Sequence, residues 1–99
     1  SGERIINALI NTLNTDPNPN VRIAAIDALE RFSGQDQVRT LIARSLNNQS
    51  SPTVQLATID ILVKYQIKAG APFLEKLLDQ SGLNPSVRVQ AQLALEILS

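Results

Sequence analysis

The sequence contains no cysteine, histidine, tryptophan or methionine. Without cysteine the chain can form neither disulfides nor thiolate metal sites, and without histidine it lacks the most common general base. Nine basic and nine acidic side chains cancel to zero formal charge, so there is no concentrated basic field for a nucleic acid. No apolar run approaches the roughly 20 residues that cross a bilayer. We therefore expect no cofactor, no metal, no nucleic-acid partner and no membrane insertion.

What the sequence does contain is one stretch in three copies. A short polar residue precedes proline at Asn18-Pro19, Ser51-Pro52 and Asn84-Pro85, and the prolines are 33 residues apart. Asn and Ser side chains cap helix N-termini, and proline fits the first helical position because its missing N–H would have no partner there. A fixed period of this length is typical of proteins built from stacked repeats.

Apolar residues follow each proline at helical spacing, and residues 3–14, 36–48 and 70–80 show the same spacing without the capped opening. The sequence therefore predicts an all-α fold: a right-handed α-solenoid of stacked antiparallel helix pairs, with about six helices and no sheet. The predicted core comprises Val21, Ala25, Leu29, Leu41, Val54, Ile61, Leu62, Leu74, Val87 and Leu95.

The period also predicts the domain organisation. We expect a single domain over residues 3–99, made of a half repeat (3–18), two repeats (19–51 and 52–84) and a second half repeat (85–99). Ser1-Gly2 is typical of a tag or processing scar, and we expect the chain to be a piece of a longer protein. Ile97 and Leu98 would then lack a covering repeat, which predicts weak self-association through the exposed repeat ends.

The first copy resembles the opening of a HEAT repeat, meaning its first helix and the turn before it. The matching residues are Asp16-Pro17-Asn18-Pro19-Asn20-Val21-Arg22, Ala24-Ala25 and Ala28-Leu29. The most similar variety is the short bacterial HEAT repeat, shared with the HEAT-like repeats of phycobilin lyases. The resemblance covers essentially the whole chain, and it identifies a fold that serves many unrelated functions.

The HEAT family places an acid before the first helix and a base in its first turn, and these residues stack into a ladder between repeats. Asp16 and Arg22 match this pattern. The second repeat departs from it with Gln49 and Gln55. The third repeat keeps a base, Arg88, but has glycine in the acid position. The resemblance therefore implies a ladder whose charges are complete only in the first repeat.

One pair of carboxylates has a spacing that could suit a catalytic site. Asp27 and Asp60 occupy the same position in successive capped helices, and packed helices lie about 8–10 Å apart, which overlaps the roughly 6.5–9.5 Å carboxylate separation of inverting glycosidases. The alternative interpretation is a solvated acidic position, and it is favoured because Leu93 replaces the acid in the third copy. We therefore predict no catalytic residue.

The predicted function is a non-catalytic scaffold for protein–protein interaction, as part of a larger bacterial adaptor or regulatory protein. This is the use that the resemblance implies. The alternative is an accessory repeat region of an enzyme, such as a lyase, whose catalytic residues lie outside the chain. The partner's identity and the compartment, cytoplasm or periplasm, are left open.

The resemblance also implies that the second helices of the pairs line a concave surface, which solenoids use for recognition. On residues 3–14, 36–48 and 70–80 the outward positions are mainly amides and hydroxyls, with Arg44 as a planar donor and Phe73 as a possible apolar anchor. The candidate partner surface comprises Asn7, Asn11, Asn14, Thr40, Arg44, Asn47, Phe73 and Gln80.

Overall fold

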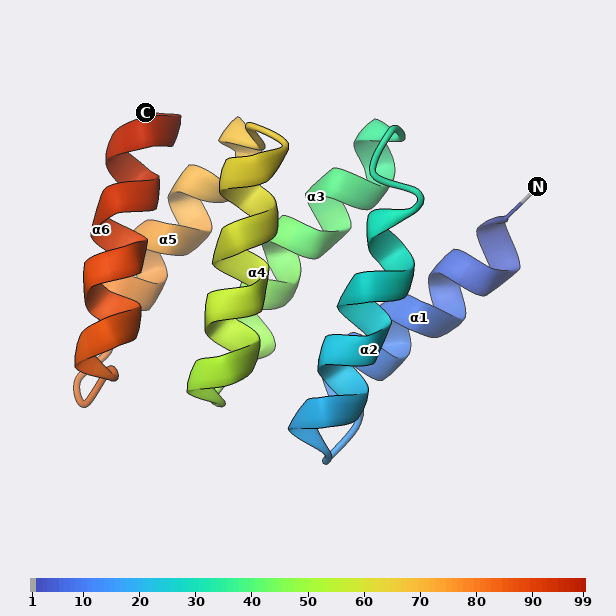
Figure 1. Cartoon of the computed structure of the whole chain (residues 1–99), viewed down its shortest axis with the longest axis horizontal. Coiled ribbons are helices and arrows are strands. Elements are labelled where there is room, and N and C mark those ends of the chain that lie inside the picture. The colour runs from blue at the N-terminus through green and yellow to red at the C-terminus, as the bar shows by residue number, and fades with distance from the viewer. Residues whose placement is uncertain (1) are drawn as a thin grey trace.

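A computed structural model describes residues 2–99 of the chain. Within this range the chain forms α-helices and short 3₁₀ helices but no strand (Figure 1), which confirms the all-α prediction. The elements are α1 (Glu3–Thr15), α2 (Pro19–Glu30), α3 (Asp36–Ser45), η1 (Leu46–Asn48), α4 (Pro52–Lys64), η2 (Lys68–Gly70), α5 (Ala71–Leu78) and α6 (Pro85–Leu98).

The helices form two layers (Figure 1). In the front layer α2, α4 and α6 lie side by side and run in the same direction, while α1, α3 and α5 form a back layer that crosses behind them. Contacts between α1 and α2 and between α5 and α6 join the layers, and α4 packs between α2 and α6. This arrangement is compatible with a helical repeat solenoid, in which each unit buries its apolar side against its neighbours.

The three proline-containing openings mark the first residues of α2, α4 and α6, as predicted. Asn18 accepts a hydrogen bond from the backbone N–H of Asn20 at 2.9 Å, and Asn84 accepts from two N–H groups of the first turn of α6. Ser51 differs, because its hydroxyl bonds to the Thr53 hydroxyl at 3.0 Å and caps no backbone N–H. The first helical position of α4 is therefore occupied by proline without a side-chain cap.

Most of the predicted core is buried, but Val21 is not. Its side chain is 38% exposed, although the equivalent Val54 and Val87 are completely buried. Within residues 2–99 no front-layer helix precedes α2, so this side of Val21 has no neighbour to cover it. Leu41 and Leu95 were also predicted to be buried, and both are only half-buried.

Two buried isoleucines of α2 and α4 are missing from the predicted core. Ile26 and Ile59 occupy equivalent positions of α2 and α4, and each is 1% exposed. These helices contact neighbours within the front layer as well as behind it, so each buries a broad sector instead of one stripe. A prediction based on a single stripe therefore misses them.

The C-terminal helix is covered differently from the prediction. Ile97 and Leu98 were both expected to lack cover, but Leu98 is only 2% exposed. Leu98 continues the buried row of Val87, Ala91 and Ala94, at the helical spacing of one face. Ile97 lies beside this row and is 51% exposed, so the expectation is wrong for Leu98 alone.

The C-terminus of α4 is a Schellman motif. The N–H of Ile67 donates to the carbonyl of Leu62 at 2.8 Å, and the N–H of Gln66 donates to the carbonyl of Val63 at 3.1 Å. Gln66 has φ = 52°, in the left-handed region where a residue with a Cβ costs roughly 1–2 kcal/mol. Glycine or asparagine usually occupies this position.

We expect Gln66→Gly to raise the free energy of unfolding by about 0.5–1 kcal/mol, because relief of backbone strain outweighs the greater entropy of the unfolded chain. Urea denaturation measures the change. The matched control is Gly82→Ala, since Gly82 has φ = 75° with nothing near its Cβ position, and this replacement should destabilise the protein by strain alone. A loss of stability in Gln66→Gly would contradict the assignment of strain to Gln66.

Candidate functional site

The predicted partner surface lies on the back layer and the turns at its edge. None of its eight residues is fully buried. The exposed members are Asn7, Asn11, Arg44, Asn47 and Gln80, and the half-buried members are Asn14, Thr40 and Phe73.

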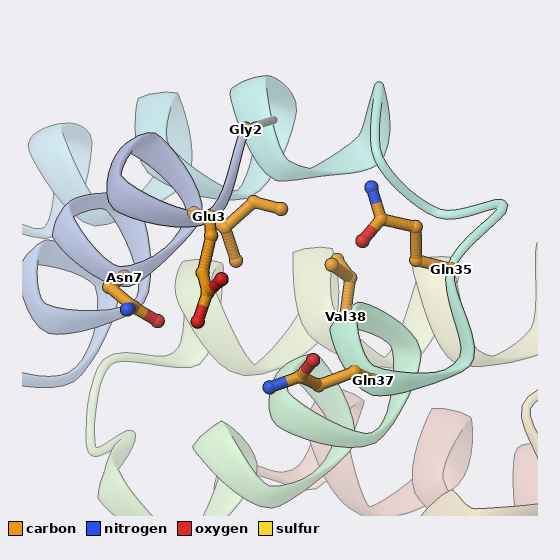
Figure 2. A pocket seen from close by; sticks show the side chains of 7 residues that line it. Gly2, Glu3, Asn7, Gln35, Gln37 and Val38 are labelled. Atoms are coloured by element: carbon orange, nitrogen blue, oxygen red, sulfur yellow. The ribbon is translucent and has the colours of Figure 1, made fainter.

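A polar hollow of about 260 Å³ opens beside the N-terminal ends of α1 and α3. Figure 2 shows Glu3 and Asn7 from α1 on one side, and Gln35, Gln37 and Val38 on the other. One carboxylate and three amides thus surround an opening with two aliphatic side chains, Ile6 and Val38, in its wall. Such a combination can hydrogen-bond to a peptide backbone or a polar side chain.

A second hollow lies one repeat further along the back layer, between the start of α3 and the segment after α4. It has a volume of about 510 Å³, and its lining includes Asp36, Thr40 and Lys68. Asp36 and Thr40 stand 33 residues after Glu3 and Asn7 of the first hollow. The same place in two successive repeats therefore carries an acid followed four residues later by a neutral hydrogen-bonding side chain.

The residues nearest the turns are partly engaged within the molecule. The Asn14 side-chain oxygen accepts a hydrogen bond from the Asn48 amide at 3.1 Å. The carbonyl of Gln80 accepts from Arg88 at 3.3 Å, and Gln80 also lines a third hollow of about 330 Å³. Of the two side chains only that of Asn14 is engaged, because Gln80 uses its backbone carbonyl.

Arg44 and Phe73 differ in how available they are to a partner. Arg44 is exposed and forms no ion pair with another residue of 2–99, so its guanidinium can donate two parallel hydrogen bonds to a carboxylate. Phe73 is half-buried and packs against the core cluster. Its ring therefore stabilises the fold, and only part of it can contact a partner.

Arg22 of α2 forms hydrogen bonds with the turn before α2 and with the turn before α4. Its guanidinium donates at 2.9 Å to the carbonyl of Asn48 and at 2.9 Å to the side-chain oxygen of Gln49, while its Nε donates to the carbonyl of Asp16. The Gln49 amide in turn donates to the carbonyl of Leu13 at 3.0 Å. Glutamine thus accepts the hydrogen bond that the family pattern assigns to an acid.

The rest of the ladder differs from the family pattern. Gln55 donates to the carbonyl of Gln49 at 3.0 Å, in the turn before its own helix α4. Arg88 donates to the carbonyls of Leu78 and Gln80 in the turn before α6. The repeats are therefore connected here by hydrogen bonds from side chains to amides and carbonyls, and the Asp16 carboxylate takes no part in the Arg22 contact.

Glu30 of α2 connects the front-layer helices. Its carboxylate accepts hydrogen bonds at 2.6 Å from both the Lys64 ammonium and the Tyr65 hydroxyl. The hydrogen bond from Lys64 is the main cause that lowers the pKa of Glu30, with the Tyr65 hydroxyl second, and the same contact with Glu30 raises the pKa of Lys64. The pair thus persists at neutral pH and weakens as pH falls through the lowered Glu30 pKa.

The two aspartates considered for catalysis both lie exposed on the front layer. Asp60 lines a groove between α4 and α6, and the lining of this groove does not include Asp27. Their placement agrees with the solvated interpretation.

Comparison with known proteins gave one match. A family model described as HEAT repeats matches residues 6–96, which is most of the chain. No curated protein and no solved structure matched it. None of the helices in residues 2–99 has the length and apolar character needed to cross a membrane.

Proposed function

Because the chain belongs to the HEAT repeat family, we propose that it is a non-catalytic scaffold that binds a partner protein through its back layer. HEAT repeats commonly mediate protein interactions, and repeat proteins present extended surfaces for this purpose. The composition supports a non-catalytic role, because the chain lacks both histidine and cysteine, the residues most often used as general base and activated nucleophile.

The observation that carries this proposal is the recurrence of one polar hollow at two places 33 residues apart. Glu3 with Asn7, and Asp36 with Thr40, provide the same sequence of an acid and a hydrogen-bonding side chain. The Asp36 carboxylate is paired with Arg39, whereas Glu3 forms no ion pair with another residue of 2–99. Two equivalent hollows along one layer suit a ligand that is itself extended, since a segment of polypeptide offers backbone N–H and C=O groups at regular intervals.

The chemistry of the surface defines the kind of partner segment. Most exposed groups are uncharged amides, which make adaptable hydrogen bonds, and Arg44 supplies the cation. Arginine is enriched among interface residues that dominate affinity. A polar, extended segment with a carboxylate near Arg44 therefore fits the back layer best.

The proposal predicts that Arg44→Ala weakens partner binding about 10- to 30-fold, because it removes the charge-assisted contact. The partner is first isolated with the immobilised chain and identified, and its affinity is then measured by calorimetry. Asn11→Ala should change affinity by less than about 3-fold, since asparagines at such interfaces contribute mainly complementarity.

The matched control is Asp27→Ala, an exposed change on the front layer. It should leave affinity unchanged. Phe73→Ala is unsuitable, because the ring packs against the core and its loss would damage the fold. Unchanged affinity in Arg44→Ala, together with lost affinity in Asp27→Ala, would contradict the assignment of binding to the back layer.

A further inference from the structure

Three aliphatic side chains of α6 face solvent in one row. Val89, Leu93 and Ile97 are 52%, 49% and 51% exposed, and a spacing of four residues places them on one helix face. Large apolar side chains exposed together indicate an interaction site, whereas single ones are ordinary. We call this row the α6 strip.

The other front-layer helices do not carry such a row. The positions equivalent to Leu93 hold Asp27 in α2 and Asp60 in α4, and those equivalent to Ile97 hold Arg31, just after α2, and Lys64. All four of these charged residues are exposed. The fold thus accommodates charges at these two positions, and core packing does not require the aliphatic residues Leu93 and Ile97.

The strip borders a groove of about 410 Å³ between α4 and α6. Buried Ile59 and Ala94 and half-buried Val63 contribute apolar surface to its lining. Asp60, Lys64 and Gln90 supply polar groups. An apolar centre with a polar rim is the composition of a protein-binding surface.

The free charge at this rim is negative. The Lys64 ammonium is already paired with the Glu30 carboxylate at 2.6 Å. Asp60 is exposed and forms no ion pair with another residue of 2–99. A ligand that covers the groove therefore gains most if it brings a cation to Asp60.

We propose that this groove binds an amphipathic helix of a partner protein, with apolar side chains on the α6 strip and a lysine or arginine beside Asp60. Eight residues separate Val89 from Ile97, which is about 12 Å along a helix at 1.5 Å per residue. This length matches the i, i+4 and i+7 anchors of a helix bound in a groove. The site lies on the front layer and is independent of the partner surface on the back layer.

A second copy of the chain fits the groove less well. In a two-fold contact the same patch meets itself, so a dimer centred on Leu93 would add a second unpaired Asp60 instead of a cation. The occupant is therefore a different helix with a basic flank.

The test uses two synthetic 18-residue helical peptides with leucine at the anchor positions, one flanked by lysine and the other by glutamate at the same positions. Fluorescence anisotropy measures their binding to the 99-residue chain. The lysine peptide should bind at least about 10-fold more tightly than the glutamate peptide, because Asp60 attracts one and repels the other. A combined Leu93→Asp and Ile97→Lys variant should weaken binding of the lysine peptide at least about 10-fold.

Both replacements copy the residues of α4 at the same positions, so the double variant should keep its helical content and melting temperature. Asp60→Asn tests the charge separately and should bring the affinities of the two peptides together. Asp27→Asn, at the equivalent position of α2, should leave the affinities of both peptides unchanged. Equal binding of both peptides to the unmodified chain, or undiminished binding to the double variant, would overturn the proposal. The proposal would also be overturned if sedimentation showed a dimer of the unmodified chain that the double variant abolishes. The occupant of the groove would then be a second copy of the chain.

Discussion

Leu62→Ala is expected to lower the free energy of unfolding by about 2–5 kcal/mol, through lost burial and the cavity that remains. Leu62 is completely buried in α4, the helix that packs between α2 and α6 in the front layer. Little relaxation can fill the space, because neighbours surround the helix on both sides. Chemical denaturation gives the value directly.

Leu93→Ala is the matched control for this prediction, since Leu93 is 49% exposed and its loss should cost no more than about 0.5 kcal/mol. Gly70→Ala tests the packing of the Leu62 side chain against Gly70. A Cβ on Gly70 would lie 2.8 Å from Cδ1 of Leu62, so this change alone should destabilise by about 1–3 kcal/mol. The double variant should cost less than the two single changes together, because the added methyl enters the cavity. A cost below about 0.5 kcal/mol for Leu62→Ala would place Leu62 outside the core.

The sequence was most informative where a local rule fixes the backbone. The starts of α2, α4 and α6 were predicted to the residue because proline prefers the first helical position. The end of α4 follows no such local rule, since Gln66 adopts a left-handed conformation that is far more typical of glycine. The conformation there is set by burial of Ile67, which is a tertiary contact.

Burial was predicted well for the centre of each buried sector and poorly for its edges. Leu29 and Leu62 belong to the predicted core, whereas Ile26 and Ile59 are equally buried but lie outside it. The hydrophobic period identifies the centre of a buried sector. The width of that sector depends on how many helices surround it, which the sequence of one helix does not contain.

For the candidate surfaces too, the sequence predicted the exposed positions but not how the helices bring them together. The outward positions of the back layer followed from helical register, and none of those eight residues proved to be fully buried. Their grouping into two equivalent hollows depends on how α1, α3 and the segment after α4 meet. The replacement of an acid by Leu93 was visible in the sequence, but the groove beside it exists only because α4 packs against α6.

The hydrogen bonds that Gln49 forms with Arg22 and Leu13 lead to the second large effect on stability. Gln49→Leu is expected to cost about 1–3 kcal/mol, because it leaves buried hydrogen-bonding groups without a partner. Gln49 is 4% exposed and contacts both the Arg22 guanidinium and the carbonyl of Leu13. Leucine is similar in size but can neither accept from Arg22 nor donate to Leu13. Urea denaturation measures the loss.

Two further variants separate this hydrogen-bonded connection from simple packing. Asn48→Ala removes a side chain that bonds to Asn14 at the exposed surface, and it should change stability by no more than about 0.5 kcal/mol. Arg22→Met combined with Gln49→Leu should cost less than the sum of the single changes, because the first change already removes the donor that the second leaves unpaired. Strict additivity would show that Arg22 and Gln49 act independently. The link between α2 and α4 would then rest on their direct packing and on the hydrogen bonds of Glu30 with Lys64 and Tyr65.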